Sequence, residues 1–235
     1  MRLLVLAGGF GTRLKTTVGD VPKALAPVGD LPFLQLQVEH WLEQGLSEFT
    51  FLLHHQADQI IDFLKVMQAG QLKGCQIDWL IEQTPLDTGG AIAHAVKDLC
   101  LTDDFLMINA DTWLGDGTRE LKLSPSPAMA VVNLPDVSRY GQVHFDQSYY
   151  VTGLEEKNGY SGAGWINAGL CHLSADLFKS WNGQPFSLER DFFPTLIQNR
   201  SLKVVRLQTD FIDIGIPADY FRFCNWVEAG CEFSL

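Results

Sequence analysis

The chain has 235 residues, of which 46% are hydrophobic and 19% are charged, and its formal net charge is −11. This composition excludes a disordered chain, and the acidic charge argues against a protein that binds nucleic acid. No apolar run approaches the roughly 20 residues that a membrane-spanning helix needs, and the short N-terminal run ends in glycines instead of a cleavage site. We therefore expect a cytoplasmic protein with a single globular domain, residues 1–235, and no membrane or nucleic-acid partner.

The first half of the chain alternates short apolar runs with amphipathic segments. The pattern predicts strands at 3–7, 49–53, 77–81 and 105–108, and helices at 33–45, 57–69 and 89–100. This alternation is typical of a parallel, doubly wound α/β sheet, in which ligands bind beyond the carboxyl ends of the strands. Glycine-rich or polar clusters follow three of these strands, at residues 8–15, 82–90 and 109–111. We expect the functional site to lie where these clusters meet.

The second half, after residue 124, has shorter apolar runs and a loop at residues 124–127. Strands are predicted at 128–134, 142–146, 149–154, 166–173 and 203–207, and one helix at 188–199. We expect a mixed sheet that extends the sheet of the first half. Residues 1–123 and 124–235 would then be two halves of one domain.

A glycine-rich turn, Gly8-Gly9-Phe10-Gly11-Thr12-Arg13, follows the first predicted strand. Glycine permits positive φ and lets backbone N–H groups approach an anion closely, although such a turn can also be purely structural. The spacing fits neither a Walker loop nor the dinucleotide fingerprint. Four basic residues and one acidic residue occur among the first 23, and two of the basic ones, Arg13 and Lys23, would flank the turn. This cationic segment in an acidic chain predicts a small anionic ligand.

Residues 4–14 (LVLAGGFGTRL) and 22–25 (PKAL) resemble the signature of sugar-1-phosphate nucleotidyltransferases. Six further segments resemble motifs of that family in the same order: 82–91, 109–111, 140–141, 156–157, 167–169 and 213–217. The resemblance spans nearly the whole chain. It implies a Rossmann-like three-layer sandwich of the GT-A-like type, with a mostly parallel central sheet. It also implies a nucleotide-binding half at 1–123 and a sugar-binding half at 124–235.

The reaction that the resemblance implies is the condensation of an NTP with a sugar 1-phosphate to give an NDP-sugar and pyrophosphate, with Mg²⁺ as cofactor. The resemblance gives the catalytic role to Arg13 and Lys23, and the metal to Asp111 and Asp213. The implied nucleotide-binding residues are Leu6, Ala7, Gly8, Gly9, Gly11, Thr12, Gln83 and Gly89. The implied sugar-phosphate-binding residues are Gly141, Glu156, Lys157 and Asn167. These residue types suit the task, because a guanidinium and an ammonium bind phosphates and carboxylates are hard ligands for Mg²⁺.

The sequence departs from the family pattern at three positions, none of which removes a charged catalytic residue. Asp87 stands where many relatives have glycine beside the nucleobase, Asn158 stands where proline is usual, and Ile216 stands where threonine is common. The identity of the base is therefore left open by the sequence. His54 and His55 end a predicted strand, and we interpret them as surface or loop residues rather than metal ligands.

The run from residue 13 to residue 28, with Pro32-Phe33-Leu34, is most similar to D-glycero-α-D-manno-heptose 1-phosphate guanylyltransferases. The resemblance then implies GTP and this heptose phosphate as partners and GDP-heptose for surface polysaccharide as the product. The alternatives in the class are a mannose 1-phosphate guanylyltransferase and a MurNAc or glucose 1-phosphate uridylyl- or thymidylyltransferase. An alternative of another class is a non-catalytic nucleotide-sugar-binding regulatory protein, although the retained charged residues favour an enzyme. A homo-oligomer is left open.

Overall fold

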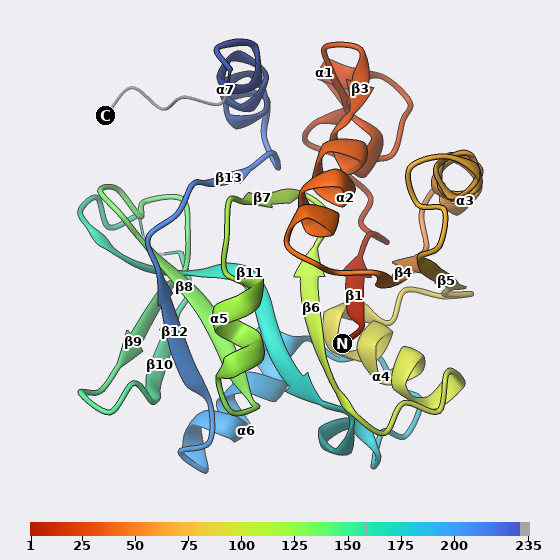
Figure 1. Cartoon of the computed structure of the whole chain (residues 1–235). Coiled ribbons are helices and arrows are strands. Elements are labelled where there is room, and N and C mark those ends of the chain that lie inside the picture. Colours follow the sequence, from red (N-terminus) through yellow and green to blue (C-terminus); the bar gives the residue numbers. More distant parts are fainter. Residues whose placement is uncertain (158, 231–235) are drawn as a thin grey trace.

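The computed structural model describes residues 1–157 and 159–230, and it shows a central sheet with helices on both sides (Figure 1). Asn158 therefore lies outside the described residues. The strands of the central sheet are β1 (Leu3–Leu6), β4 (Glu48–Leu53), β5 (Gln76–Ile81), β6 (Asp104–Asn109), β8 (Ala128–Leu134), β9 (Gln142–Phe145), β10 (Val151–Glu155), β11 (Gly164–Ser174) and β12 (Lys203–Leu207). Their order is β10-β9-β11-β6-β1-β4-β5, with β8 paired to β11 and β12 paired to β8. The prediction of an α/β sheet with parallel strands in the first half is confirmed.

Three layers form because successive side chains of a strand point to opposite faces of the sheet. Leu3 and Val5 of β1 are buried in one cluster with residues of α2 (Phe33–Glu43) and α3 (Ala57–Ala69). Leu4 between them belongs to a second cluster, which includes α4 (Asp87–Asp98) and α6 (Phe193–Gln198). The helices α2 and α3 therefore cover one face, with α5 (Thr118–Leu123), and α4 and α6 cover the other.

The long strand β11 joins the two halves of the chain into one sheet. It runs antiparallel to β6, where Leu170 pairs with Ile108, and antiparallel to β8, where Ile166 pairs with Val132. The predicted extension of the sheet by a mixed second half is therefore confirmed. The predicted helix at 188–199 divides into a π-helical turn, η3 (Leu188–Phe192), and α6, because Pro194 lacks the N–H that would continue the helix from the preceding turn.

A small two-stranded sheet, which the sequence did not predict, lies beyond the carboxyl end of β6. It pairs β7 (Thr112–Leu114) with β13 (Phe211–Asp213) in antiparallel register, so that Asp213 lies opposite Thr112. The helix α7 (Pro217–Glu228) follows β13 and packs in a third apolar cluster, which also contains Leu14 and Ile212. This cluster fixes the C-terminal segment next to the N-terminal turn, as the upper part of Figure 1 shows.

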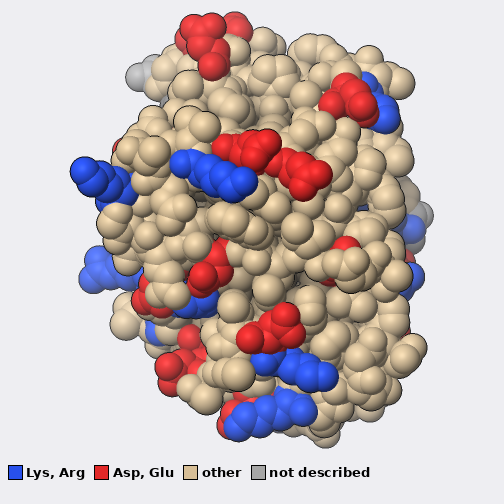
Figure 2. Space-filling view, turned by 90° about the vertical axis from the view of Figure 1, so that its right-hand side faces the viewer, with Lys and Arg blue, Asp and Glu red and all other residues tan. Residues whose placement is uncertain are grey.

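The face over α3, α4 and β5 carries acidic and basic side chains next to one another (Figure 2). Among the described residues on that face, no broad area of one charge is visible. Within residues 1–157 and 159–230, none of the helices has the length and apolar character that crossing a bilayer requires.

Candidate functional site

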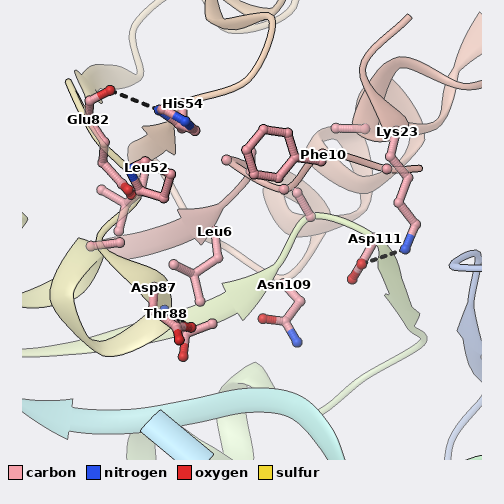
Figure 3. Close-up of a pocket in the computed structure, with 18 of the residues that line it drawn as sticks. Leu6, Phe10, Lys23, Leu52, His54, Glu82, Asp87, Thr88, Asn109 and Asp111 are labelled. Carbon is pink, nitrogen blue, oxygen red and sulfur yellow. Dashed lines mark hydrogen bonds and ion pairs between the residues drawn. The ribbon is translucent and has the colours of Figure 1, made fainter. Parts of the chain in front are cut away.

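A cavity of about 730 Å³ opens at the carboxyl ends of β1, β4 and β6 (Figure 3). It is lined by the turn that follows β1, by Lys23 and Ala24, by residues between Glu82 and Ala91, and by the segment 109–111. The three clusters that the sequence singled out therefore meet at one edge of the sheet, as expected for parallel strands. The cavity has two ends, one near Lys23 and Asp111 and the other near Glu82 and Asp87.

The N-terminal turn forms one wall of the cavity and depends on its glycines. Gly11 has φ +59°, and a Cβ at this position would lie 3.3 Å from Cβ of Lys23, so the turn passes close to that lysine. Gly9 has nothing within 4 Å of the position where a Cβ would stand, which leaves its backbone open toward the cavity. Leu14, 1% exposed, anchors the end of the turn in the apolar cluster beneath α7. The predicted residues Leu6, Ala7, Gly8, Gly9, Gly11, Thr12 and Arg13 all line the cavity.

Lys23 lies between two carboxylates at one end of the cavity. Its Nζ is 2.6 Å from Oδ2 of Asp111 and 3.6 Å from Oδ1 of Asp213. Gly215 gives the lysine room, since a Cβ there would lie 3.0 Å from Nζ. The single ammonium is thus held by two acids that come from distant parts of the chain.

Pairing of β7 with β13 is what brings the two acids together. Ile214 N–H donates to the carbonyl oxygen of Asp111 at 2.9 Å, and Gly215 N–H donates to Oδ1 of Asp213 at 2.6 Å. Burial and the charge of Asp111 raise the pKa of Asp213, and the Lys23 ammonium opposes that shift.

The two acids fit part of a magnesium site. Their carboxylate oxygens are hard ligands, and a nearby ammonium can compensate their charge when no cation is bound. Within residues 1–157 and 159–230 there is no group of three or more His, Cys, Asp or Glu residues placed to hold a metal. Phosphate oxygens of a substrate and water would therefore have to complete the six ligands that Mg²⁺ prefers.

The four basic residues of the N-terminal segment do not form one patch. Arg2 is paired with Asp78, 2.6 Å away, and Lys15 is paired with Asp20 at 2.8 Å. Only Arg13 and Lys23 line the cavity. The structure thus reduces the predicted cationic segment to two cations at the turn.

The other end of the cavity is lined by apolar side chains together with Glu82, Asp87, Thr88 and one histidine. Leu6 and Leu52 line it, and Glu82, 9% exposed, lies beside them (Figure 3). Oε2 of Glu82 accepts a hydrogen bond from Leu86 N–H at 2.8 Å. Burial raises the pKa of Glu82, although this hydrogen bond lowers it in part. His54 Nδ1 donates to the Glu82 carbonyl oxygen at 3.0 Å.

The structure places the two predicted base-pocket residues Gln83 and Gly89 outside the cavity lining. Gln83 is exposed next to the buried Glu82. Gly89 is buried in the first turn of α4, where its N–H donates to the Phe186 carbonyl oxygen at 2.9 Å. A Cβ at Gly89 would overlap the ring of Phe186, so the glycine is needed for packing.

The four predicted sugar-phosphate residues lie together at the ends of β9, β10 and β11, beside the cavity and outside its lining. Gly141 precedes β9, and a Cβ there would lie 2.7 Å from the Glu155 carbonyl oxygen. Glu156 and Lys157 follow β10 and are exposed. Asn167 of β11 accepts a hydrogen bond from Gly169 N–H. Gly169 in turn lies against Asn109, which lines the cavity.

Several lining residues were missed or undervalued in the sequence. Phe10 at the tip of the turn is 54% exposed, and its ring contacts His54 and His55 with centroids 5.7 and 5.2 Å away. His54 follows β4 as a loop residue, as the sequence indicated, and it also lines the cavity, which the sequence did not indicate. Asn109 also lines the cavity, although the sequence analysis named it only as part of the segment 109–111. Glu82 could have been identified from its position, because it is an acid that directly follows the apolar run of a predicted strand.

Comparisons with known proteins identify relatives of the whole chain. The sequence matches the family described as nucleotidyl transferase over residues 2–229. It is 33% identical to a D-glycero-alpha-D-manno-heptose 1-phosphate guanylyltransferase of Campylobacter jejuni, over 95% of this chain and 98% of the relative. It is 30% identical to an enzyme of the same name from Aneurinibacillus thermoaerophilus, over 94% of this chain and 95% of that relative. The crystal structure of HddC from Yersinia pseudotuberculosis superposes with a TM-score of 0.84 at 34% identity, over 96% of this chain and 99% of that one, and a second structure of it holds GMP-PN. The family match over residues 2–229 and the identity to these relatives show that this chain belongs to the nucleotidyl transferase family.

Proposed function

We propose that this protein is a guanylyltransferase that joins GTP to D-glycero-α-D-manno-heptose 1-phosphate and releases pyrophosphate. One observation carries the proposal: a single cavity has Lys23 and Asp111 at one end, with Asp213 next to the lysine, and a buried carboxylate, Glu82, at the other. A nucleoside triphosphate needs cations for its phosphates and a recognition surface for its base. The relatives named for this heptose phosphate, and the GMP-PN held by the Yersinia protein, support the choice of substrates.

Glu82 favours guanine at the apolar end. Guanine presents its N1–H and its 2-amino group side by side, and one carboxylate can accept from both. Uracil and thymine present one N–H between two carbonyl oxygens, which a carboxylate repels. Leu6 and Leu52 would contact the flat faces of the base. A buried acid at this position therefore selects a base with two adjacent donors.

The reaction requires positioning more than proton transfer. An oxygen of the sugar phosphate attacks the α-phosphorus of GTP in line, the new P–O bond forms, and the α–β bridging oxygen leaves with the electron pair as pyrophosphate. The nucleophile is already an anion, so no strong general base is needed. Arg13 would pair with the β- and γ-phosphates, and Lys23 would stabilise charge at the α-phosphate. The open backbone at Gly9 lets N–H groups approach the triphosphate.

Asp111 and Asp213 are the proposed magnesium ligands. When bound, Mg²⁺ would neutralise negative charge on the phosphates and on the leaving pyrophosphate. Both acids already lie next to Lys23, so binding of the ion would free this lysine to contact the phosphates.

Gly141, Glu156, Lys157 and Asn167 are the proposed contacts of the sugar phosphate. Their support is the strand register, which places Gln142 opposite both Glu155 and Ile166. Lys157 supplies the cation for the phosphate, and Glu156 and Asn167 supply acceptors for hydroxyl groups. The substrates are charged phosphate esters that do not cross a bilayer, so we place the reaction in the cytoplasm, where nucleoside triphosphates are made.

The test is a matrix of substrates with pyrophosphate release as the readout. GTP, CTP, UTP, dTTP and ATP are each combined with the heptose phosphate, mannose 1-phosphate and glucose 1-phosphate. We expect the highest kcat/KM for GTP with the heptose phosphate. Faster turnover of mannose 1-phosphate would move the assignment to that guanylyltransferase. Absence of turnover with every pair would favour a regulatory protein that binds nucleotide sugars.

A further inference from the structure

We propose that Asp87, held in place by Arg190, is a second selector of the nucleobase and accepts a hydrogen bond from the 2-amino group of guanine. This inference rests on the proposed function, since it assumes that GTP occupies the cavity.

Asp87 lines the apolar end of the cavity and adopts a conformation that suits its position. Its φ is +60°, a left-handed conformation that asparagine and aspartate tolerate better than other residues with a side chain. Oδ1 accepts a hydrogen bond from the N–H of Thr88 at 2.7 Å, at the start of α4. Figure 3 shows Asp87 beside Leu6, at the far side of the cavity from Lys23. The carboxylate therefore stands where the base would lie.

Arg190 fixes the carboxylate from a segment about one hundred residues away in the chain. Its Nη2 is 2.6 Å from Oδ2 of Asp87. The two segments are also joined by main-chain hydrogen bonds, from Gly89 and Gly90 N–H to the Phe186 carbonyl oxygen and from Phe186 N–H to Leu86. The guanidinium thus orients the acid and compensates its charge, which allows a second carboxylate close to Glu82.

The other polar groups at this end are already engaged. The Thr88 hydroxyl accepts from Leu188 N–H at 2.9 Å and donates to Glu189 at 3.3 Å. His54 Nδ1 donates to the Glu82 carbonyl oxygen. A carboxylate has about four acceptor positions, and Asp87 uses one on each oxygen, so it can accept further hydrogen bonds. Asp87 and Glu82 are therefore the acceptors available to a ligand.

Two carboxylates match guanine better than any other common base. Guanine has three N–H bonds on one edge, one at N1 and two on the 2-amino group. Glu82 can accept from N1–H and one amino hydrogen, which leaves the second amino hydrogen for Asp87. The base of inosine has the same ring and lacks only the 2-amino group. Discrimination between GTP and inosine triphosphate (ITP) therefore isolates the contribution of Asp87 better than a comparison with pyrimidines.

The experiment measures the ratio of kcat/KM for GTP to that for ITP, with the same sugar phosphate. We expect Asp87→Gly to lower this ratio by about 10- to 100-fold, the usual effect of one hydrogen bond to a charged group, with little change for ITP. Glycine tolerates φ +60°, so this variant should unfold near the temperature of the wild type. Arg190→Ala should lower the ratio less, and Arg190→Lys should recover part of it, because arginine acts through Asp87.

The matched control is Asp146→Asn, compared with Asp87→Asn. Asp146 also accepts from an arginine, Arg200 at 2.7 Å, and from backbone N–H groups, but it lies outside the cavity lining. The ratio should fall for Asp87→Asn and stay unchanged for Asp146→Asn. If the wild type uses GTP and the ratio of kcat/KM for GTP to that for ITP is the same in the wild type and in all Asp87 variants, this inference is overturned and the proposed function stands. A wild type that does not turn over GTP with any sugar phosphate would instead overturn the proposed function.

Discussion

The two ends of the cavity are built from different parts of the chain. At the end near Lys23 and Asp111, the proposed phosphate end, the turn after β1 and Lys23 come from one stretch of 23 residues, and Gly11 allows the backbone to pass close to the lysine. At the nucleobase end, Asp87 is held by Arg190 and Gly89 packs against Phe186, so the contacts join segments about one hundred residues apart. The two cations thus come from one local segment, although tertiary pairing brings the acids to Lys23, whereas these two contacts at the Asp87 end join segments far apart in the chain.

Lys23→Ala should have the largest effect and should act on the phosphate end alone. Loss of the ammonium removes charge stabilisation at the reacting phosphates, and we expect kcat to fall about 100- to 1,000-fold. The control is Lys15→Ala, which removes an exposed lysine paired with Asp20 and should leave kcat unchanged. Steady-state pyrophosphate release measures both. A Lys23→Ala variant with a near-normal rate would remove Lys23 from the catalytic residues.

Asp111→Asn should reduce the affinity for Mg²⁺ by about tenfold or more, because a neutral amide replaces an anionic oxygen ligand. The measurement is activity as a function of magnesium concentration at saturating GTP. Asp116→Asn is the control. Asp116 follows Asp111 closely in the chain but does not line the cavity, and among the contacts described its carboxylate accepts only from Gly117 N–H. An unchanged magnesium titration for Asp111→Asn would contradict its assignment.

Gly89→Ala tests the nucleobase end through stability. The added methyl group would overlap the Phe186 ring, and the side chains would have to move apart. We expect this rearrangement to lower the free energy of unfolding by about 1–3 kcal/mol. Gly9→Ala is the matched variant at the phosphate end, where nothing lies within 4 Å of the new Cβ. It should keep its stability and raise KM for the nucleotide, because the methyl group restricts the approach of phosphate. Denaturant unfolding and kinetics of both variants separate the two ends.

For stability, Glu82→Gln should show the smallest effect, a change in the pH dependence of the free energy of unfolding. Burial raises the pKa of Glu82 above its ordinary 4.5, so the folded state binds this proton more tightly than the unfolded state. The stability that Glu82 contributes is complete below pH 4.5 and is lost as the pH rises through the raised pKa. The glutamine variant should therefore gain stability relative to the wild type between about pH 4.5 and neutral pH. If the difference in the free energy of unfolding between the two proteins stays constant over this pH range, burial does not raise the pKa of Glu82.

The sequence predicted most strands of the central sheet and missed the short strands outside it. The runs at 128–134 and 203–207 match β8 and β12, because apolar residues on a buried sheet form continuous runs. β7 and β13 have three residues each and exist as strands because they pair with each other. Such short segments carry no periodicity, so the sequence gives no sign of them.

The sequence by itself determined the turn, its two flanking cations and the acids that follow the strands, since glycine, charge and apolar runs are properties of single residues and short segments. Only the tertiary structure decided which acids meet Lys23, which two of four cations face the cavity, and that Glu82 rather than Gln83 lies in it. The reason is physical: burial, pKa and hydrogen-bond partners arise from neighbours in space. Those neighbours, such as Asp213 for Asp111 and Arg190 for Asp87, lie about one hundred residues away along the chain.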